Sequence, residues 1–156
     1  MRVHIATDHA AFDLKQYLVK ELGDLGYEVI DHGASTYDAQ DDYPVYIIPC
    51  AEAVVADAGS LGIVLGGSGN GEQIAANKVP GVRCALAYNP ELARLGREHN
   101  NANLVALGGR MQPLDVGFEI VRTFLETPFS EDPRHVRRIA MLTQYEDDHV
   151  APKAAQ

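Results

Sequence analysis

A glycine-rich segment, residues 66–72, carries the residues best suited to chemistry in this sequence. It reads Gly-Gly-Ser-Gly-Asn-Gly-Glu, with a short apolar run before it and a helix-like stretch after it. Glycine lets the backbone bend and approach a ligand closely, and free N–H groups at a helix start attract negative charge. The segment therefore predicts an anion site suited to a phosphate.

The segment does not fit the common glycine-rich motifs. Glu72 stands where a dinucleotide fingerprint needs glycine, and Glu72-Gln73 stand where a P-loop needs Lys and then Ser or Thr. Asn70 stands where a nucleophile elbow centred on Ser68 needs glycine, which disfavours a hydrolase. Glu72 has two interpretations: a carboxylate that performs chemistry beside the anion, or a residue that complements the helix dipole. Spacing alone leaves both open.

Two polar residues, Asp8 and His9, follow the strand-like residues 2–7. In an open parallel sheet, ligands bind beyond the carboxyl ends of strands, where the strand order reverses. The common flavodoxin-like order places that point between the first and third strands, so Asp8 and His9 would face the glycine-rich segment. The alternative is a helix cap by Asp8 and a surface histidine. Position favours the functional interpretation.

Arg134, Arg137 and Arg138 have the spacing i, i+3 and i+4, so a helix would present them on one face. Arginine binds phosphate through paired N–H groups. A solvated basic face is the alternative, but clustered arginines are less expected in a chain of net charge −9. Arg110 is a further candidate. A lone histidine such as His99 is more often incidental than catalytic, and no pair of histidines has metal-ligand spacing, so no metal is predicted.

Strand-like and helix-like segments alternate five times, and one further helix follows. The strands are expected at residues 2–7, 27–31, 61–65, 82–87 and 103–107, and the helices at 12–25, 45–56, 72–78, 90–98, 114–126 and 130–147. This pattern predicts an α/β fold: a single-domain, doubly wound (Rossmann or flavodoxin-like) five-stranded parallel sheet with helices on both faces and an extra C-terminal helix. The domain is expected to span residues 1–149, with residues 150–156 as a flexible tail.

Composition bounds the class of protein. The chain has 156 residues, 46% hydrophobic and 22% charged, which is typical of one globular domain. We expect a cytoplasmic protein with no membrane partner, because no apolar run has membrane-spanning length and no signal peptide is visible. The net charge of −9 argues against a nucleic-acid partner. Cys50 and Cys84 lack metal or redox spacing and are expected to be reduced core residues.

Taken in order, the motifs resemble a known family. They are Asp8-His9-Ala10, Asp42-Tyr43-Pro44, the glycine-rich segment, Glu98-His99-Asn100, Gly108-Gly109-Arg110 and the arginine-bearing last helix. Over residues 2–145 the chain resembles the family that contains ribose-5-phosphate isomerase B, galactose-6-phosphate isomerase subunits and allose-6-phosphate isomerase. The resemblance implies a cofactor-independent aldose–ketose isomerase that works through an enediolate.

The resemblance also implies roles and leaves alternatives. Ribose 5-phosphate and ribulose 5-phosphate, of the pentose phosphate pathway, are the first expectation for the substrate pair. A six-carbon sugar phosphate is the nearest alternative, and a non-catalytic sugar-phosphate-binding regulatory module is an alternative of another class. By position, His99 would assist ring opening. The substrate would be held by Asp8, His9, Tyr43, Gly67, Ser68, Gly69, Asn70, Gly71, Asn100, Arg110, Arg134 and Arg138, with the arginines on the phosphate and Ser68 also donating to the enediolate.

One family branch carries a cysteine base at the position of Gly66, and another carries a glutamate base at the position of Glu72. This chain has no thiol in the segment, so the resemblance implies that Glu72 is the base. It also implies a homodimer or tetramer with composite sites. His99 and Asn100 follow a helix, so simple topology puts them at the opposite end of the sheet from the glycine-rich segment. Three interpretations follow: His99 is not catalytic, its loop reaches the site by an unusual path, or it serves a second subunit. The resemblance favours the last.

Overall fold

The computed structural model describes residues 1–154 and contains five strands, six α-helices and one short 3-10 helix. In chain order these are β1 (Arg2–Thr7), η1 (His9–Ala11), α1 (Phe12–Asp24), β2 (Glu28–Asp31), α2 (Pro44–Ala56), β3 (Leu61–Gly66), α3 (Asn70–Ala76), β4 (Cys84–Leu86), α4 (Pro90–Asn100), β5 (Leu104–Gly108), α5 (Leu114–Glu126) and α6 (Pro133–Asp148). The predicted alternation of strands and helices is confirmed.

All strand pairs are parallel, and the order across the sheet is β2-β1-β3-β5-β4. The predicted reversal between β1 and β3 is confirmed. The observed order departs from the common flavodoxin-like order only in the last two strands, where β5 lies beside β3 and β4 forms the edge. All of β5 is buried, whereas β4 is short and only its first residue is buried. A short, half-buried strand is better suited to an edge than an apolar one.

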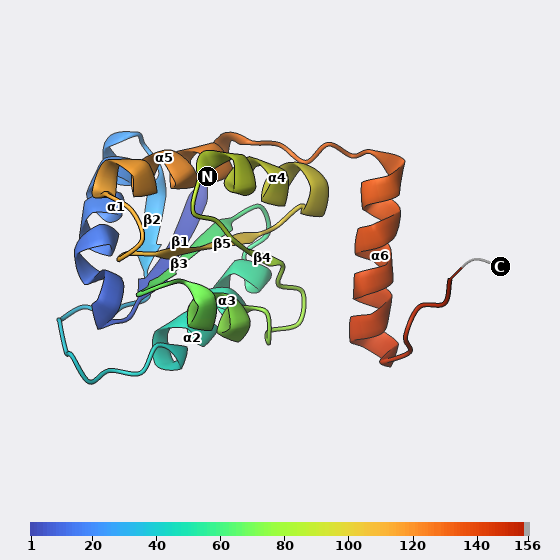
Figure 1. Ribbon diagram of the computed structural model, residues 1–156, viewed down its shortest axis with the longest axis horizontal. Helices are drawn as coiled ribbons and strands as arrows, with labels where there is room; N and C mark the ends of the chain where they lie inside the picture. The colour runs from blue at the N-terminus through green and yellow to red at the C-terminus, as the bar shows by residue number, and fades with distance from the viewer. Residues whose placement is uncertain (155–156) are drawn as a thin grey trace.

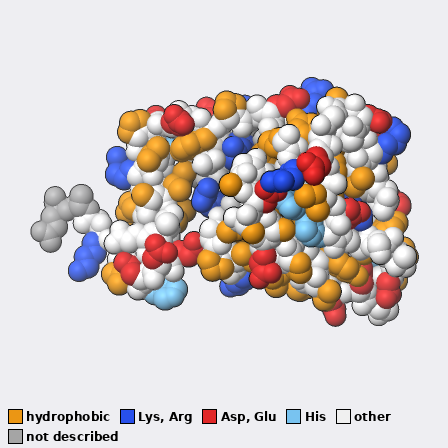
Figure 2. Space-filling view, turned by 180° about the vertical axis from the view of Figure 1, so that it is seen from behind, with side chains coloured by type: hydrophobic (Ala, Val, Ile, Leu, Met, Phe, Trp, Pro, Cys, Tyr) orange, Lys and Arg blue, Asp and Glu red, His pale blue; other side chains and the backbone are white. Residues whose placement is uncertain are grey.

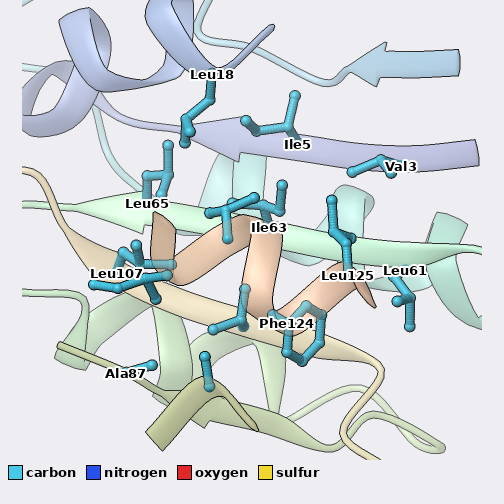
Figure 3. Packing of buried hydrophobic residues seen from close by; sticks show 14 of the residues in the cluster. Val3, Ile5, Leu18, Leu61, Ile63, Leu65, Ala87, Leu107, Phe124 and Leu125 are labelled. Atoms are coloured by element: carbon cyan, nitrogen blue, oxygen red, sulfur yellow. The ribbon is translucent and has the colours of Figure 1, made fainter. Parts of the chain in front are cut away.

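Helices cover both faces of the sheet, as Figure 1 shows. Helices α1, α4 and α5 lie on one face, and α2 and α3 lie on the other. The first core joins residues such as Leu18 and Phe124 to Ile5 and Ile63 of the strands (Figure 3). The second core packs Ile47 and its neighbours from α2 against the opposite side of β1, β3 and β5. Both free cysteines are buried, as expected.

Helix α4 extends further than the sequence predicted. Asn89 caps its start, because the Asn89 side chain accepts a hydrogen bond from Leu92 N at 2.9 Å. The helix ends only when Asn101 adopts a left-handed conformation, with φ of 43°. His99 and Asn100 therefore occupy the last turn of a helix and not the loop that the sequence suggested, which fixes the directions of their side chains.

Helix α6 lies outside the two helix layers, beyond the β4 edge of the sheet (Figure 1), and Gly81 N donates to its Glu146 Oε2 at 2.8 Å. Its cap is Asp132, which accepts from Arg134 N at 2.9 Å, so the helix begins at Pro133 and not at residue 130 as expected. Hydrophobic side chains are visible on the α6 lobe, at the left of Figure 2. The α6 residues Val136, Leu142 and Tyr145 are 47%, 62% and 49% exposed. The helix thus exposes apolar surface that its own chain does not cover.

Two further expectations concern the C-terminal boundary of the domain and membrane-spanning helices. Helix α6 ends at Asp148, and residues 155–156 of the expected flexible tail lie outside the described residues, so the domain boundary stays a prediction. Across residues 1–154, we find no helix with the length and apolar character needed to span a bilayer.

Candidate functional site

The glycine-rich segment forms a tight turn between β3 and α3. Gly69 has φ of +83°, and a β-carbon there would lie 2.8 Å from Leu86 Cδ1 and 2.9 Å from the Leu107 carbonyl carbon, so only glycine fits. Within residues 1–154, the backbone N–H groups of Gly67 and Ser68 donate to no acceptor. Helix α3 has only 7 residues, so free loop N–H groups, more than a helix dipole, suit this turn to an anion.

Glu72 lies directly against this turn. The residue is only 4% exposed, and its carboxylate occupies the space that a side chain on Gly66 would need. An added β-carbon on Gly66 would overlap the carboxyl group. The end of β3 therefore has to be glycine for the carboxylate to reach this position. A thiol on residue 66, as in the cysteine branch of the family, would enter the same space.

Burial raises the pKa of Glu72 above its ordinary value of 4.5. The backbone N–H groups of Glu72 and Gly69 oppose this rise, and the nearby Asp8 carboxylate adds to it. A carboxylate with a raised pKa is a stronger base. The two backbone amides favour the ionised form. This environment suits a carboxylate that takes up and releases a proton.

Asp8 and His9 lie at the carboxyl end of β1, next to β3. Asp8 caps η1 by accepting from Ala10 N at 2.9 Å, which confirms the capping interpretation. Asp8 also lies close enough to Glu72 for its negative charge to raise the pKa of Glu72. His9 Nδ1 lies 2.7 Å from Oδ1 of Asp41 and 3.9 Å from Oδ2 of Asp8.

Asp41 was absent from the residues predicted for this site. The acidic pair Asp41-Asp42, just before Tyr43, was the available signal, but nothing in the sequence links it to His9. Within residues 1–154, Asp8, His9 and Asp41 could offer three metal-ligand atoms within 4.8 Å of one another. Because His9 Nδ1 already faces Asp41 at hydrogen-bond distance, its lone pair is not available to an ion. The absence of a metal stays a prediction.

Two further predicted residues reach the turn. The ring of Tyr43 packs against Gly71, where an added β-carbon would lie 2.9 Å from Tyr43 Cζ. Arg110 borders Gly67, where an added β-carbon would lie 3.3 Å from Arg110 Nη1. Arg110 N also donates to Gly67 O at 3.2 Å. The strand order explains this contact, because β5 and the loop that follows it lie beside β3.

The Ser68 side chain is held so that its O–H group remains available to donate a hydrogen bond. Its Oγ accepts from Asn70 N at 3.3 Å and from Asn70 Nδ2 at 3.1 Å. A hydroxyl oxygen that accepts two hydrogen bonds still has one O–H group to donate. Ser68 is exposed, so this proton is available to a ligand. Asn70 thus serves the site by orienting Ser68.

Four predicted residues lie away from the turn in this chain: His99, Asn100, Arg134 and Arg138. The segment after α4 meets the start of β3, because Gly62 N donates to Asn103 O at 2.9 Å. From Gly62 to Gly66 the strand advances by about 13 Å. The structure therefore separates the predicted residues into two groups at opposite ends of the sheet, as the topology suggested for His99 and Asn100.

His135 joins the second group and was missed by the sequence analysis, which offered no signal for it. Its ring lies on that of His99, with centroids 4.4 Å apart, and its Nδ1 lies 2.8 Å from Ser130 Oγ. Burial lowers the pKa of His135, and His99 and Arg134 lower it further. His135 therefore anchors the start of α6 to the end of α4.

Comparison with known proteins identifies relatives along nearly the whole chain. Residues 3–142 match the ribose/galactose isomerase family. The chain is 57% identical over 152 residues to ribose-5-phosphate isomerase B of Mycolicibacterium paratuberculosis, covering 97% of this chain and 96% of that protein. It is 37% identical to a putative sugar phosphate isomerase of Bacillus subtilis, covering 96% of this chain and 100% of the other.

Solved structures give the same result. Ribose-5-phosphate isomerase B of Clostridium thermocellum has a TM-score of 0.91 and 41% identity, covering 96% of this chain and 100% of that one. The enzyme of Mycoplasma genitalium, solved with bound ribulose-5-phosphate, has a TM-score of 0.91 and 36% identity, covering 94% and 97%. In both sequence and fold, therefore, this chain belongs to the ribose/galactose isomerase family.

Proposed function

We propose that the protein interconverts ribose 5-phosphate and ribulose 5-phosphate without a cofactor. The relatives at 57% identity are named ribose-5-phosphate isomerase B, and a structural neighbour holds ribulose-5-phosphate. The observation that carries the proposal is the Glu72 carboxylate, buried against Gly66 beside free backbone N–H groups. A protein that only binds a sugar phosphate gains nothing from a buried anion at this position.

In the proposed reaction, Glu72 removes the proton from C2 of the open-chain aldose. The C2–H electron pair forms a C1=C2 double bond and the carbonyl electrons move onto O1, which gives an enediolate. The proton of the C2 hydroxyl then passes to O1, the C2=O bond forms, and Glu72 delivers a proton to C1 as the ketose forms. A carboxylate is a weak base for a carbon acid, so the oxyanion must be strongly stabilised away from water. The N–H groups of Gly67 and Ser68 and the Ser68 hydroxyl are the donors that supply this stabilisation.

The other residues around the turn hold the substrate. Asp8, His9 and Tyr43 bind the sugar hydroxyls, and Arg110 contributes positive charge at the edge of the turn. The assignments of Tyr43 and Arg110 rest on their contacts with the glycine-rich segment. Those of Asp8 and His9 rest on their place after β1, which pairs with β3, and all four residues occupy positions in the family motifs.

Sugar length is tested by comparing two substrates. The protein is incubated separately with ribose 5-phosphate and with allose 6-phosphate, and ketose formation is followed at matched concentrations. We expect a higher kcat/KM for the five-carbon substrate. A higher value for allose 6-phosphate would move the function to the six-carbon branch of the family, and no turnover of either would contradict the proposal.

We further propose that the working unit is a homodimer whose sites are shared between subunits. His99, Asn100, Arg134 and Arg138 lie at the far end of the sheet from Glu72 in this chain, and α6 carries uncovered apolar side chains. A two-fold arrangement would bring each such group to the glycine-rich turn of the other subunit and form two equivalent sites. His99 would then assist ring opening, and Arg134 and Arg138 would bind the phosphate.

Subunit complementation tests the shared site. Inactive Glu72→Gln and inactive His99→Ala proteins are mixed under conditions that allow exchange, and exchange is verified with differently tagged subunits. If each site takes the two residues from different chains, a mixed dimer regains one intact site and activity returns. Verified exchange without any recovery would show that both residues come from one chain.

A cytoplasmic location is also proposed. A doubly charged sugar phosphate does not cross membranes unaided, so the enzyme is expected in the compartment that makes its substrate. Cys50 and Cys84 are buried as free thiols, which fits a reducing compartment.

A further inference from the structure

Asp41 makes an unusual double contact with His9. Its Oδ1 atom accepts a hydrogen bond from His9 N at 3.0 Å and lies 2.7 Å from His9 Nδ1. One oxygen therefore holds both the backbone and the ring of the same residue. The Asp41 side chain is 6% exposed, whereas the His9 side chain is 24% exposed. Asp41 lies behind the histidine, and the histidine has the greater access to a ligand.

The chemistry of the pair determines where the ring proton resides. A carboxylate only accepts hydrogen bonds, so His9 Nδ1 must carry a hydrogen atom. Which nitrogen of an imidazole is protonated is set by the hydrogen bond of the other. Nε2 is then left to interact with a ligand. Asp8 does not compete for this role, because its Oδ2 lies 3.9 Å from Nδ1, beyond hydrogen-bond distance.

Two other contacts limit the movement of the pair. The ring of Tyr37 meets the His9 ring edge-on, with centroids 6.2 Å apart. Asp41 N donates to Asp38 O at 3.1 Å, which closes the turn that carries Asp41. The second carboxylate oxygen of Asp41 is buried and has no hydrogen-bond partner within residues 1–154. The hydrogen bonds that the Asp41 side chain accepts through Oδ1 both come from His9.

We propose that Asp41 is a positioning residue for the isomerase: it holds His9 in the Nδ1–H tautomer, so that Nε2 is presented to the sugar. This inference rests on the proposed function, in which His9 binds the substrate. Asp41 itself does not touch the substrate. Its effect passes through His9, as the partners behind ligating histidines act in other sites.

The tautomer is measured by two-bond ¹H–¹⁵N NMR of the imidazole rings, with the His9 signals assigned from the His9→Ala spectrum. We expect Nδ1–H in the parent and a shift to Nε2–H in Asp41→Ala. Asp41→Asn keeps an oxygen acceptor, so it should keep the tautomer. Asp42→Ala, at the exposed neighbouring carboxylate, is the matched control and should leave the tautomer unchanged. An Nε2–H tautomer in the parent would overturn the proposal even if Asp41→Ala fails to fold.

Kinetics test whether Asp41 acts through His9. We expect Asp41→Ala to lower kcat/KM roughly tenfold to a hundredfold, with Asp41→Asn restoring most of it. In the His9→Ala background, Asp41→Ala should cause no further loss. Losses that multiply in the double variant would show that Asp41 acts independently and would overturn the proposal. If the parent forms no ribulose 5-phosphate, the proposed function fails instead, and the tautomer still decides the Asp41–His9 contact.

Discussion

Gly66→Ala tests whether the position of the Glu72 carboxylate matters for turnover. The added β-carbon would overlap the carboxyl group. Nonbonded carbon and oxygen atoms need about 3.5 Å between them, so the carboxylate must withdraw by roughly 1.5 Å. The obstructed atoms belong to the far end of a flexible side chain, so we expect the fold to persist and the carboxylate to move.

The size of the effect follows from that displacement. A misplacement of about 1 Å in a reacting group costs on the order of 10²-fold in rate. We therefore expect kcat to fall by about a hundredfold or more. KM should change by less than about threefold, because the groups that bind the sugar and the phosphate stay in place.

The assay follows ketose formation from ribose 5-phosphate, with thermal unfolding measured on the same samples. Gly62→Ala is the matched control: it lies in the same strand, and its added β-carbon meets Val54 Cγ2 at 2.7 Å and Leu104 Cγ at 2.8 Å, in the core. We expect Gly62→Ala to lower the Tm but to leave kcat per folded molecule unchanged. A folded Gly66→Ala protein with at least half of the parent kcat would refute the reasoning.

The remaining predictions concern the same base and the phosphate site. Glu72→Gln should lower kcat by roughly 10²–10⁴-fold with little change in affinity, which kinetic and binding measurements check. The raised pKa of Glu72 means that its ionisation opposes folding, so Glu72→Gln should have a higher Tm than the parent at pH 7–8, and this difference should shrink as the pH falls through the raised pKa. Because Glu72 must be ionised to act as a base, kcat/KM of the parent should rise with pH around an apparent pKa above 4.5. An apparent pKa at the ordinary glutamate value would contradict this. Adding Gly66→Cys to the Glu72→Ala variant should restore part of the lost activity, because the thiol enters the space that the carboxylate leaves. A folded double variant without any recovery would show that the thiol and the carboxylate do not occupy equivalent positions. Arg134→Ala and Arg138→Ala should each raise KM about tenfold to a hundredfold, from the loss of a charged hydrogen bond of roughly 1.5–3 kcal/mol. Equal inhibition of parent and variants by inorganic phosphate would show that these arginines form only a solvated face.

Much of the fold was predictable because each buried strand is an apolar run between turn residues. The sequence also identified the turn at residues 66–72, since no other segment combines so many glycines with a polar helix start. The order of β4 and β5 was not predictable from alternation, because both orders satisfy it. What decides between them is burial: β5 is covered throughout, whereas β4 is short and half exposed.

The contacts that were missed depend on loop conformation. Asp41 reaches His9 across 32 positions of the chain, through a loop whose path the sequence pattern does not specify. His135 reaches His99 only because α6 begins against the end of α4. The end of α4 was also missed, because the left-handed conformation of Asn101 is not encoded by apolar spacing. Local sequence patterns predict the helices and strands, whereas contacts between residues far apart in the chain, such as Asp41 with His9, become visible only in the structure.

The most direct test of the account is isomerisation of ribose 5-phosphate in D₂O, followed by ¹H NMR without added cofactor and with a chelator present. We expect ribulose 5-phosphate that carries solvent deuterium at C1, because Glu72 exchanges the abstracted proton with solvent before returning it. Glu72→Gln should form neither the ketose nor deuterated aldose. Absence of ketose from the parent, or ketose formation and deuterium uptake by Glu72→Gln as fast as by the parent, would contradict proton transfer through Glu72.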